Sequence, residues 1–176
     1  MGRNQATVIP MNATDLRTMQ APLKERYRDD PAAALLTLKA AGELGDAVTC
    51  RVETGKALVE AGLHPATGGD GSAACSGDIL LQALVACAGV TLRAVATALD
   101  IPVRGGTVRA EGDLDFRGTL GVSKETPVGF QAIRLSFDLD TDATAEQKET
   151  LIKLTKRYCV IYQTLERSPR LEASIT

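Results

Sequence analysis

The sequence predicts an α+β fold built around one long buried helix, and three observations support that prediction. Residues 76–99 are apolar almost throughout, which is typical of a helix covered on most sides. Two later stretches alternate apolar and polar residues, and strands with one wet face favour an antiparallel sheet. A helix-capping signature follows the second stretch. The 176 residues suit one domain with a sizeable core.

The N-terminal part, residues 1–46, is predicted to be a tail followed by a helical extension. A first helix is expected at about residues 16–27, where apolar side chains recur at helical spacing. Asp30 followed by proline is a typical helix start, so a second helix is expected over residues 31–41. Residues 47–176 are predicted to form the main domain.

A hairpin and a loop are expected before the central helix. Residues 47–54 alternate apolar and polar side chains, and residues 57–60 are the expected partner strand across a tight turn. The glycine-rich loop over residues 62–71 has no Lys-Ser/Thr pair after its glycines, and no strand leads directly into it. We therefore expect it to be a connection and not a phosphate-binding loop.

The central helix is expected to begin at Ser76 as its N-cap, with Asp78 in the first turn, where a negative charge suits the helix dipole. Asp100 and the proline two residues later end it after roughly 33 Å. Cys87 lies at its centre among alanines and a glycine, which let another backbone approach the thiol. One small sheet cannot cover such a helix on all sides, so a second copy is expected to pack on it in a homodimer.

Two strands, two helices and a last strand are expected after the central helix. The inward-facing residues of the two strands are Val108, Ala110, Gly112, Leu114 and Phe116, followed by Ile133, Leu135, Phe137 and Leu139. A capping box over residues 144–147 predicts a helix, and a shorter helical segment is expected to end near Leu165. A last alternating strand is expected to contain Leu171, Ala173 and Ile175.

Composition excludes several functions. The net charge is −2 without a basic block, and tryptophan is absent, which argues against nucleic acid and anionic membranes as partners. The N-terminus lacks the apolar core of a signal peptide, and the longest apolar run of the central helix is about half of a membrane span, so we expect a cytoplasmic protein with reduced cysteines. His64 is the single histidine and has no paired ligands around it, so no metal or cofactor is expected.

Two segments resemble the OsmC/Ohr family. GGDGSAACSGDILLQALVACAGVTLRAVA, residues 68–96, resembles the family's glycine-rich lead-in and its long helix with a reactive cysteine at the centre. RYCVIYQTL, residues 157–165, resembles the second cysteine segment, and the likeness covers residues 48–176 in the order and type of elements. The resemblance implies an intertwined homodimer in which antiparallel sheets pack on two long central helices.

The chemistry that the resemblance implies is thiol-dependent reduction of organic hydroperoxides in oxidative-stress defence. Cys87 would attack the peroxide as a thiolate and become a sulfenic acid. Cys159 would resolve that sulfenic acid as a disulfide, which an external dithiol reductant would reduce. The apolar surroundings would favour organic hydroperoxides over hydrogen peroxide as substrates.

The sequence also departs from the family pattern. Gly77 stands where the peroxidase members carry a glutamate that helps to hold an arginine over the thiolate, so Asp78 and Arg51 are the candidate activating residues. Cys75 is either a third thiol at the site or a small cap residue. Val160 follows the second cysteine, where proline is common in the family.

These departures keep a second function open. An apolar site without a nearby cation raises the pKa of a thiol and makes the thiol less reactive. The alternative is therefore a non-catalytic OsmC-like dimer that binds an apolar small molecule at its interface.

Overall fold

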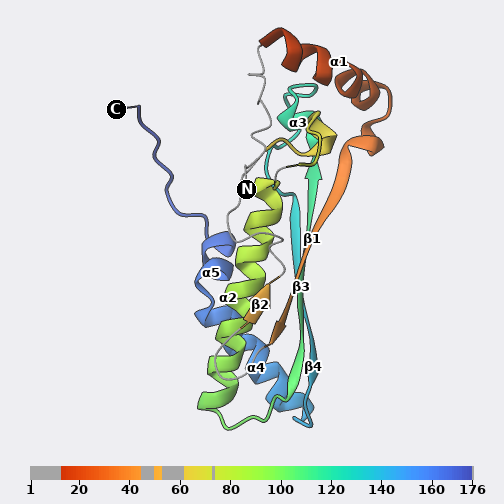
Figure 1. Ribbon diagram of the computed structural model, residues 1–176. Helices are drawn as coiled ribbons and strands as arrows, with labels where there is room; N and C mark the ends of the chain where they lie inside the picture. The colour runs from red at the N-terminus through yellow and green to blue at the C-terminus, as the bar shows by residue number, and fades with distance from the viewer. Residues whose placement is uncertain (1–12, 45–49, 53–61, 73, 176) are drawn as a thin grey trace, which may run out of the picture.

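The computed structural model describes residues 13–44, 50–52, 62–72 and 74–175, and it has the predicted α+β architecture. In chain order the elements are α1 (Ala13–Asp29), η1 (Pro31–Ala34), β1 (Leu35–Leu44), β2 (Cys50–Val52), η2 (Pro65–Thr67), α2 (Ser76–Ala98), β3 (Gly105–Asp115), α3 (Phe116–Thr119), β4 (Ala132–Asp140), α4 (Ala145–Tyr158) and α5 (Val160–Glu166). The helices α2, α4 and α5 lie on the same face of the sheet (Figure 1).

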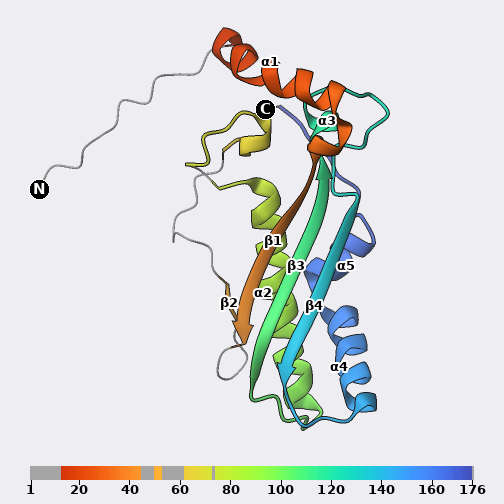
Figure 2. The same ribbon diagram turned by 90° about the vertical axis from the view of Figure 1, so that its right-hand side faces the viewer.

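The described sheet is antiparallel throughout, with the strand order β2-β1-β3-β4. The ladder between β1 and β3 begins at the pair Leu35 and Asp115, and that between β3 and β4 begins at Gly105 and Asp140. In β4 half-buried residues alternate with exposed ones along the whole strand, as predicted for a strand with one wet face. Figure 2 shows the long strands side by side with α2 behind them.

Helix α2 supplies the centre of the core. Its buried residues are Leu81, Leu84, Val85, Ala88, Gly89, Leu92, Val95 and Ala96. By length and composition alone α2 could cross a membrane, but these buried side chains make it the core helix of the fold. The prediction of Ser76 as the N-cap is wrong by one residue. Cys75 is the N-cap, because its carbonyl already accepts a hydrogen bond from the Ile79 N–H at 3.1 Å. The helix ends before Asp100, which has a left-handed φ of 52°.

The helix predicted over residues 31–41 is wrong. Asp30 does act as a cap, accepting a hydrogen bond from the Ala32 N–H at 3.1 Å, but only the single turn η1 follows. The chain then enters β1, whose residues pair with β3 from Leu35 onward. The hydrogen-bonded ladder to β3 overrides the local helix signal, since tertiary context decides segments of weak propensity. The predicted extension therefore contributes a strand to the sheet, while its boundary at residue 46 stays a prediction.

Of the other predicted elements, the first helix and the capping box are present, and the C-terminal strand is not. Helix α1 contains the first predicted helix, and the capping box between Thr144 and Gln147 is present with both of its hydrogen bonds. The strand predicted at the C-terminus is wrong for the single chain, because residues 168–175 form no strand and Leu171 is 84% exposed. Of the first predicted hairpin only β2 is described, and the rest of residues 47–60 lies outside the described part.

Candidate functional site

The structure brings Cys87 and Cys159 together between α2 and the junction of α4 and α5. Cys87 lies in the middle of α2 and is half-buried. Cys159 ends α4 as its C-cap and begins α5 as its N-cap, and it is fully buried. The Cys159 thiol donates a hydrogen bond to the Cys87 sulfur. Two thiols from distant parts of the sequence thus interact with each other.

The pKa of Cys87 lies below the ordinary value of a thiol. Burial by itself raises this pKa, but hydrogen bonds to the sulfur outweigh burial. In order of decreasing effect, the donors are the Ile161 N–H, the Cys159 thiol, the Thr91 hydroxyl and the Val160 N–H. Each of these donors favours the thiolate over the thiol. The lowered pKa therefore makes the Cys87 sulfur a better nucleophile than an ordinary thiol.

The pKa of Cys159 moves in the opposite direction. The pKa of Cys159 is raised to about 11, chiefly by burial and also by the adjacent Cys87. The Tyr162 N–H donates to the Cys159 sulfur at 3.4 Å and partly offsets this rise. At neutral pH Cys159 therefore keeps its proton, and Cys87 is the thiol of the pair that ionises at the lower pH.

The first turn of α5 explains why this site has so many donors. The first N–H groups of any helix have no partner within the helix. In α5 the N–H groups of Val160 and Ile161 lower the pKa of Cys87, and that of Tyr162 donates to the Cys159 sulfur at 3.4 Å. A proline at position 160 would have no N–H to donate. The departure from the family pattern at Val160 therefore adds a donor to the thiolate.

Two of the other predicted site residues lie at the far end of α2. Asp78 precedes Cys87 by nine residues, which is about 14 Å along a helix axis. Burial raises the pKa of Asp78, and the nearby His64 opposes that rise. Cys75 caps the backbone of α2 without a side-chain hydrogen bond to it. Within a single chain neither residue is placed to activate Cys87.

Arg51 lies on β2, where its Cα pairs with that of Glu43, but its side chain is outside the described part of the structure. Among the described residues, hydrogen bonds and not a cation lower the pKa of Cys87. The expectation that an arginine faces this sulfur in a dimer stays a prediction.

His64 has a structural role in the loop before α2. Its Nδ1 accepts a hydrogen bond from the Ala66 N–H at 3.0 Å, and its ring stacks on that of Phe116 at 5.0 Å between centroids. In the described ranges no three His, Cys, Asp or Glu side chains gather in a way that could hold a metal ion.

Reasoning from the sequence missed Thr91 and the two backbone donors of α5. Thr91 follows Cys87 by four residues, so the two side chains share one face of α2, and this spacing is visible in the sequence. The N–H groups of Val160 and Ile161 have no such signal, because every residue except proline has an N–H.

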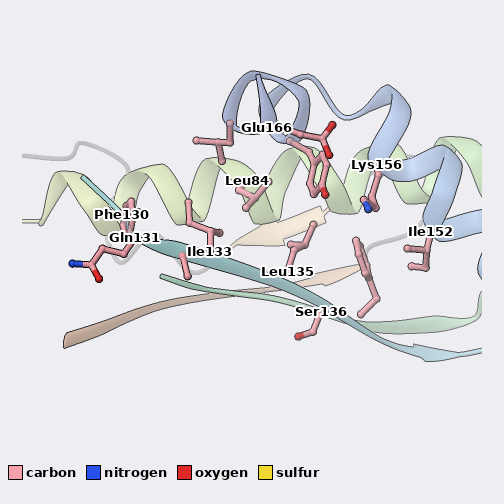
Figure 3. Close-up of a pocket in the computed structure, with 13 residues that line it drawn as sticks. Leu84, Phe130, Gln131, Ile133, Leu135, Ser136, Ile152, Lys156 and Glu166 are labelled. Carbon is pink, nitrogen blue, oxygen red and sulfur yellow. The ribbon is translucent and has the colours of Figure 1, made fainter. Parts of the chain in front are cut away.

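A groove of about 610 Å³ lies between β4 and the helices α4 and α5, and neither Cys87 nor Cys159 lines it (Figure 3). Its lining is mostly apolar and comprises Leu84, Phe130, Gln131, Ala132, Ile133, Leu135, Ser136, Phe137, Ile152, Lys156, Tyr162, Leu165 and Glu166. Leu84 precedes Cys87 by one helical turn, and the Tyr162 N–H is bonded to Cys159. The groove and the thiols therefore share the same helices.

Comparison with known proteins gives a family and a structure of similar fold. The sequence profile of the OsmC-like protein family matches residues 69–174, which include both cysteines. The crystal structure of an OsmC-like hydroperoxide resistance protein from Jannaschia sp. CCS1 is similar at a TM-score of 0.60 and 19% identity, covering 81% of this chain and 94% of that one. No curated protein matches the sequence. Because the family profile covers more than half of the chain, the protein belongs to the OsmC-like family.

Proposed function

We propose that this protein reduces organic hydroperoxides, with Cys87 as the attacking thiol and Cys159 as the resolving thiol. The observation that carries the proposal is the contact between two thiols whose pKa values are shifted in opposite directions. A two-thiol peroxidase needs one sulfur ionised and the other protonated at the start of the cycle. The hydroperoxide resistance protein of similar fold supports the same role in peroxide defence.

The first step forms a sulfenic acid. The Cys87 thiolate attacks the distal oxygen of the hydroperoxide, so that a sulfur–oxygen bond forms and the oxygen–oxygen bond breaks. The leaving alkoxide takes a proton and becomes an alcohol. The hydrogen bonds from Thr91, Val160 and Ile161 hold the sulfur in place for this attack.

The second step forms the disulfide. The sulfur of Cys159 attacks that of Cys87, the sulfur–oxygen bond breaks, and the hydroxyl group leaves with the Cys159 proton as water. The two side chains are close enough to shift each other's pKa, which supports their pairing in a disulfide. An external dithiol then returns both cysteines to thiols and is itself oxidised to a disulfide, as a reducing cytoplasm allows.

We further propose that the active form is a homodimer. Leu80 and Val90 of α2 are 36% and 39% exposed in the single chain, although this is the core helix. Leu171 and Ile175 are also exposed, on an alternating segment that has no strand partner among the described residues. An apolar helix face and an unpaired alternating segment are typical of a surface that a second copy covers. A stable monomer in sedimentation velocity at micromolar concentration would contradict the dimer.

A non-catalytic binding role is the second candidate. The apolar groove favours it, together with Gly77 at the position of the family's glutamate. In that case the protein would bind an apolar small molecule, and the thiols would take no part in its function.

Consumption of cumene hydroperoxide, coupled to oxidation of a dithiol, separates the two candidates. We expect turnover by the natural protein and a loss of at least about a thousandfold in Cys87→Ser, because the serine hydroxyl is not ionised near neutral pH. Cys75→Ser is the matched control and keeps its turnover, since Cys75 lies at the end of α2. Equal rates in the natural protein and Cys87→Ser would leave only the binding role.

A further inference from the structure

A buried threonine next to the thiol pair supports an inference that rests on the proposed function and assigns one more residue to it. We propose that the hydroxyl of Thr155 donates a hydrogen bond to the oxygen that Cys87 gains in the first step, and that this bond speeds the attack by Cys159 in the second. Thr155 thus acts in disulfide formation and not in the activation of the Cys87 thiolate.

The Thr155 hydroxyl is buried without a hydrogen-bond partner. The residue is 1% exposed, and its Oγ1 is bonded to no group of the described part of the chain. The other two buried polar side chains in that part are satisfied, since Thr67 donates to the His64 carbonyl at 2.9 Å and Asp115 accepts from Arg117. An unpaired buried hydroxyl destabilises a folded protein. Thr155 therefore has bonding capacity that the protein with free thiols does not use.

The hydroxyl also makes no bond to the backbone of its own helix. A threonine within a helix can donate to the carbonyl four residues earlier, as Thr97 does to Arg93 at 2.9 Å. Thr155 makes no such bond to Leu151, although both lie on the buried side of α4. Its hydroxyl is thus available to a group from outside α4.

The path of the chain places Thr155 next to the thiol pair. Strand β4 ends where Asp140 pairs with Gly105, at the start of β3 and a short connection after α2. Helix α4 begins there and runs back along α2 to Cys159 (Figure 1). Because α4 is antiparallel to α2 and Cys159 meets Cys87, the turn of α4 that carries Thr155 lies beside the turn of α2 that follows Cys87.

Thr155 is one helical turn from Cys159 and is bonded to neither sulfur. Its carbonyl accepts a hydrogen bond from the Cys159 N–H at 2.9 Å, and at this spacing Cβ atoms are about 5–6 Å apart. The hydrogen bonds that shift the pKa values of Cys87 and Cys159 come from other groups. An oxygen added to the Cys87 sulfur brings a new acceptor to this buried site, and a hydroxyl can donate to it.

A donor to this oxygen assists the second step. Disulfide formation breaks the sulfur–oxygen bond of Cys87, and negative charge grows on the departing oxygen until it takes the Cys159 proton and leaves as water. A fixed donor that meets developing charge in a buried site accelerates such a step. The Thr155 hydroxyl therefore lowers the stability of the reduced protein and gains its partner only after the peroxide has reacted.

Rapid-quench mass spectrometry of a single turnover separates the two steps. The reduced full chain is mixed with one equivalent of cumene hydroperoxide, and the intact mass distinguishes an added oxygen atom from the loss of two hydrogen atoms. Thr155→Val keeps the shape of the side chain and should gain oxygen at the natural rate. Its disulfide should form about tenfold more slowly, so that sulfenic acid accumulates and is trapped by dimedone. Thr155→Ser keeps the hydroxyl and should behave like the natural protein.

Thermal unfolding of the reduced proteins gives a second readout. Thr155→Val removes an unpaired buried hydroxyl, so its melting temperature should rise by about 2–4 °C. Thr97→Val removes a hydroxyl that is already bonded and should show no such rise. A lower melting temperature in Thr155→Val would mean that the hydroxyl has a structural role, which would overturn the proposal.

The remaining outcomes separate this role from the proposed function. Disulfide formation at the natural rate in Thr155→Val, or equal slowing in Thr155→Ser, would overturn the role of Thr155 and leave the peroxidase function standing. If the natural protein neither gains oxygen nor forms the disulfide, the peroxidase function fails and the role of Thr155 fails with it. Circular dichroism checks folding, and Thr155→Ala, which also lacks the hydroxyl, replaces Thr155→Val if the valine variant does not fold.

Discussion

The centre of α2 and its N-terminal end each carry a cysteine, and the two surroundings differ sharply. Cys75 at the end caps the helix through its backbone and makes no side-chain capping bond. Cys87 at the centre accepts hydrogen bonds from Thr91, Val160, Ile161 and the other thiol. What distinguishes the centre is the first turn of α5, whose N–H groups are packed against it. The reactive position is therefore made by a second helix and not by the sequence around Cys87 alone.

The largest expected effect concerns the two thiols at the centre. At pH 7.5 iodoacetamide should alkylate Cys87 more than about a hundredfold faster than Cys159, because the pKa of Cys159 is raised to about 11 and that of Cys87 is lowered. The thiolate of Cys87 is lost as the pH falls below its pKa, so its alkylation should decline at a lower pH than that of an ordinary thiol. Mass spectrometry of the two peptides over time measures both rates. Comparable rates would contradict the assignment of attacker and resolver.

Thr91→Val should have the next largest effect. The substitution keeps the shape of the side chain and removes the hydroxyl that donates to Cys87. A hydrogen bond to a charged group contributes about 1.5–3 kcal/mol, so the pKa of Cys87 should rise by about one unit or more. Alkylation at pH 7 should slow by about tenfold. Thr97→Val, on the same helix but bonded to the Arg93 carbonyl, is the control and should leave the rate unchanged.

Val160→Pro should have the smallest effect of the three. Proline is tolerated in the first turn of a helix, so α5 should form as before. The change removes one N–H donor to Cys87, the weakest of the four, and should raise its pKa enough to slow alkylation about threefold. Val160→Ala keeps the N–H and should behave like the natural protein. If both variants slow equally, the backbone donor has no part in the activation.

Much of the fold was predictable because its signals are local. The alternation in β3 and β4 and the capping box at Thr144 each depend on residues close in sequence. The strand β1 was not predictable in this way, because its leucines, alanines and lysine are helix formers and its pairing is with β3, far along the chain. Leu171 and Ile175 belong to an alternating pattern typical of a strand, but a strand also needs a neighbour, and none is described within the chain.

The site shows the same division between local and distant information. Thr91 could be found from its spacing to Cys87, whereas Asp78 was favoured only because it is one residue from the position of the family's glutamate. The helix geometry separates Asp78 from Cys87 by several turns within one chain. The two N–H donors of α5 arise from where that helix begins, which depends on the packing of α4 and α5 against α2 and not on residue type.

Peptide mapping after one equivalent of an organic hydroperoxide tests the central claim most directly. The reduced full chain is treated with cumene hydroperoxide, quenched with an alkylating agent and digested without reductant. The account predicts a peptide pair joined by a disulfide between Cys87 and Cys159, with Cys75 alkylated and unpaired. Free Cys159 beside a sulfinic or sulfonic acid at Cys87, or an unmodified Cys87, would contradict it.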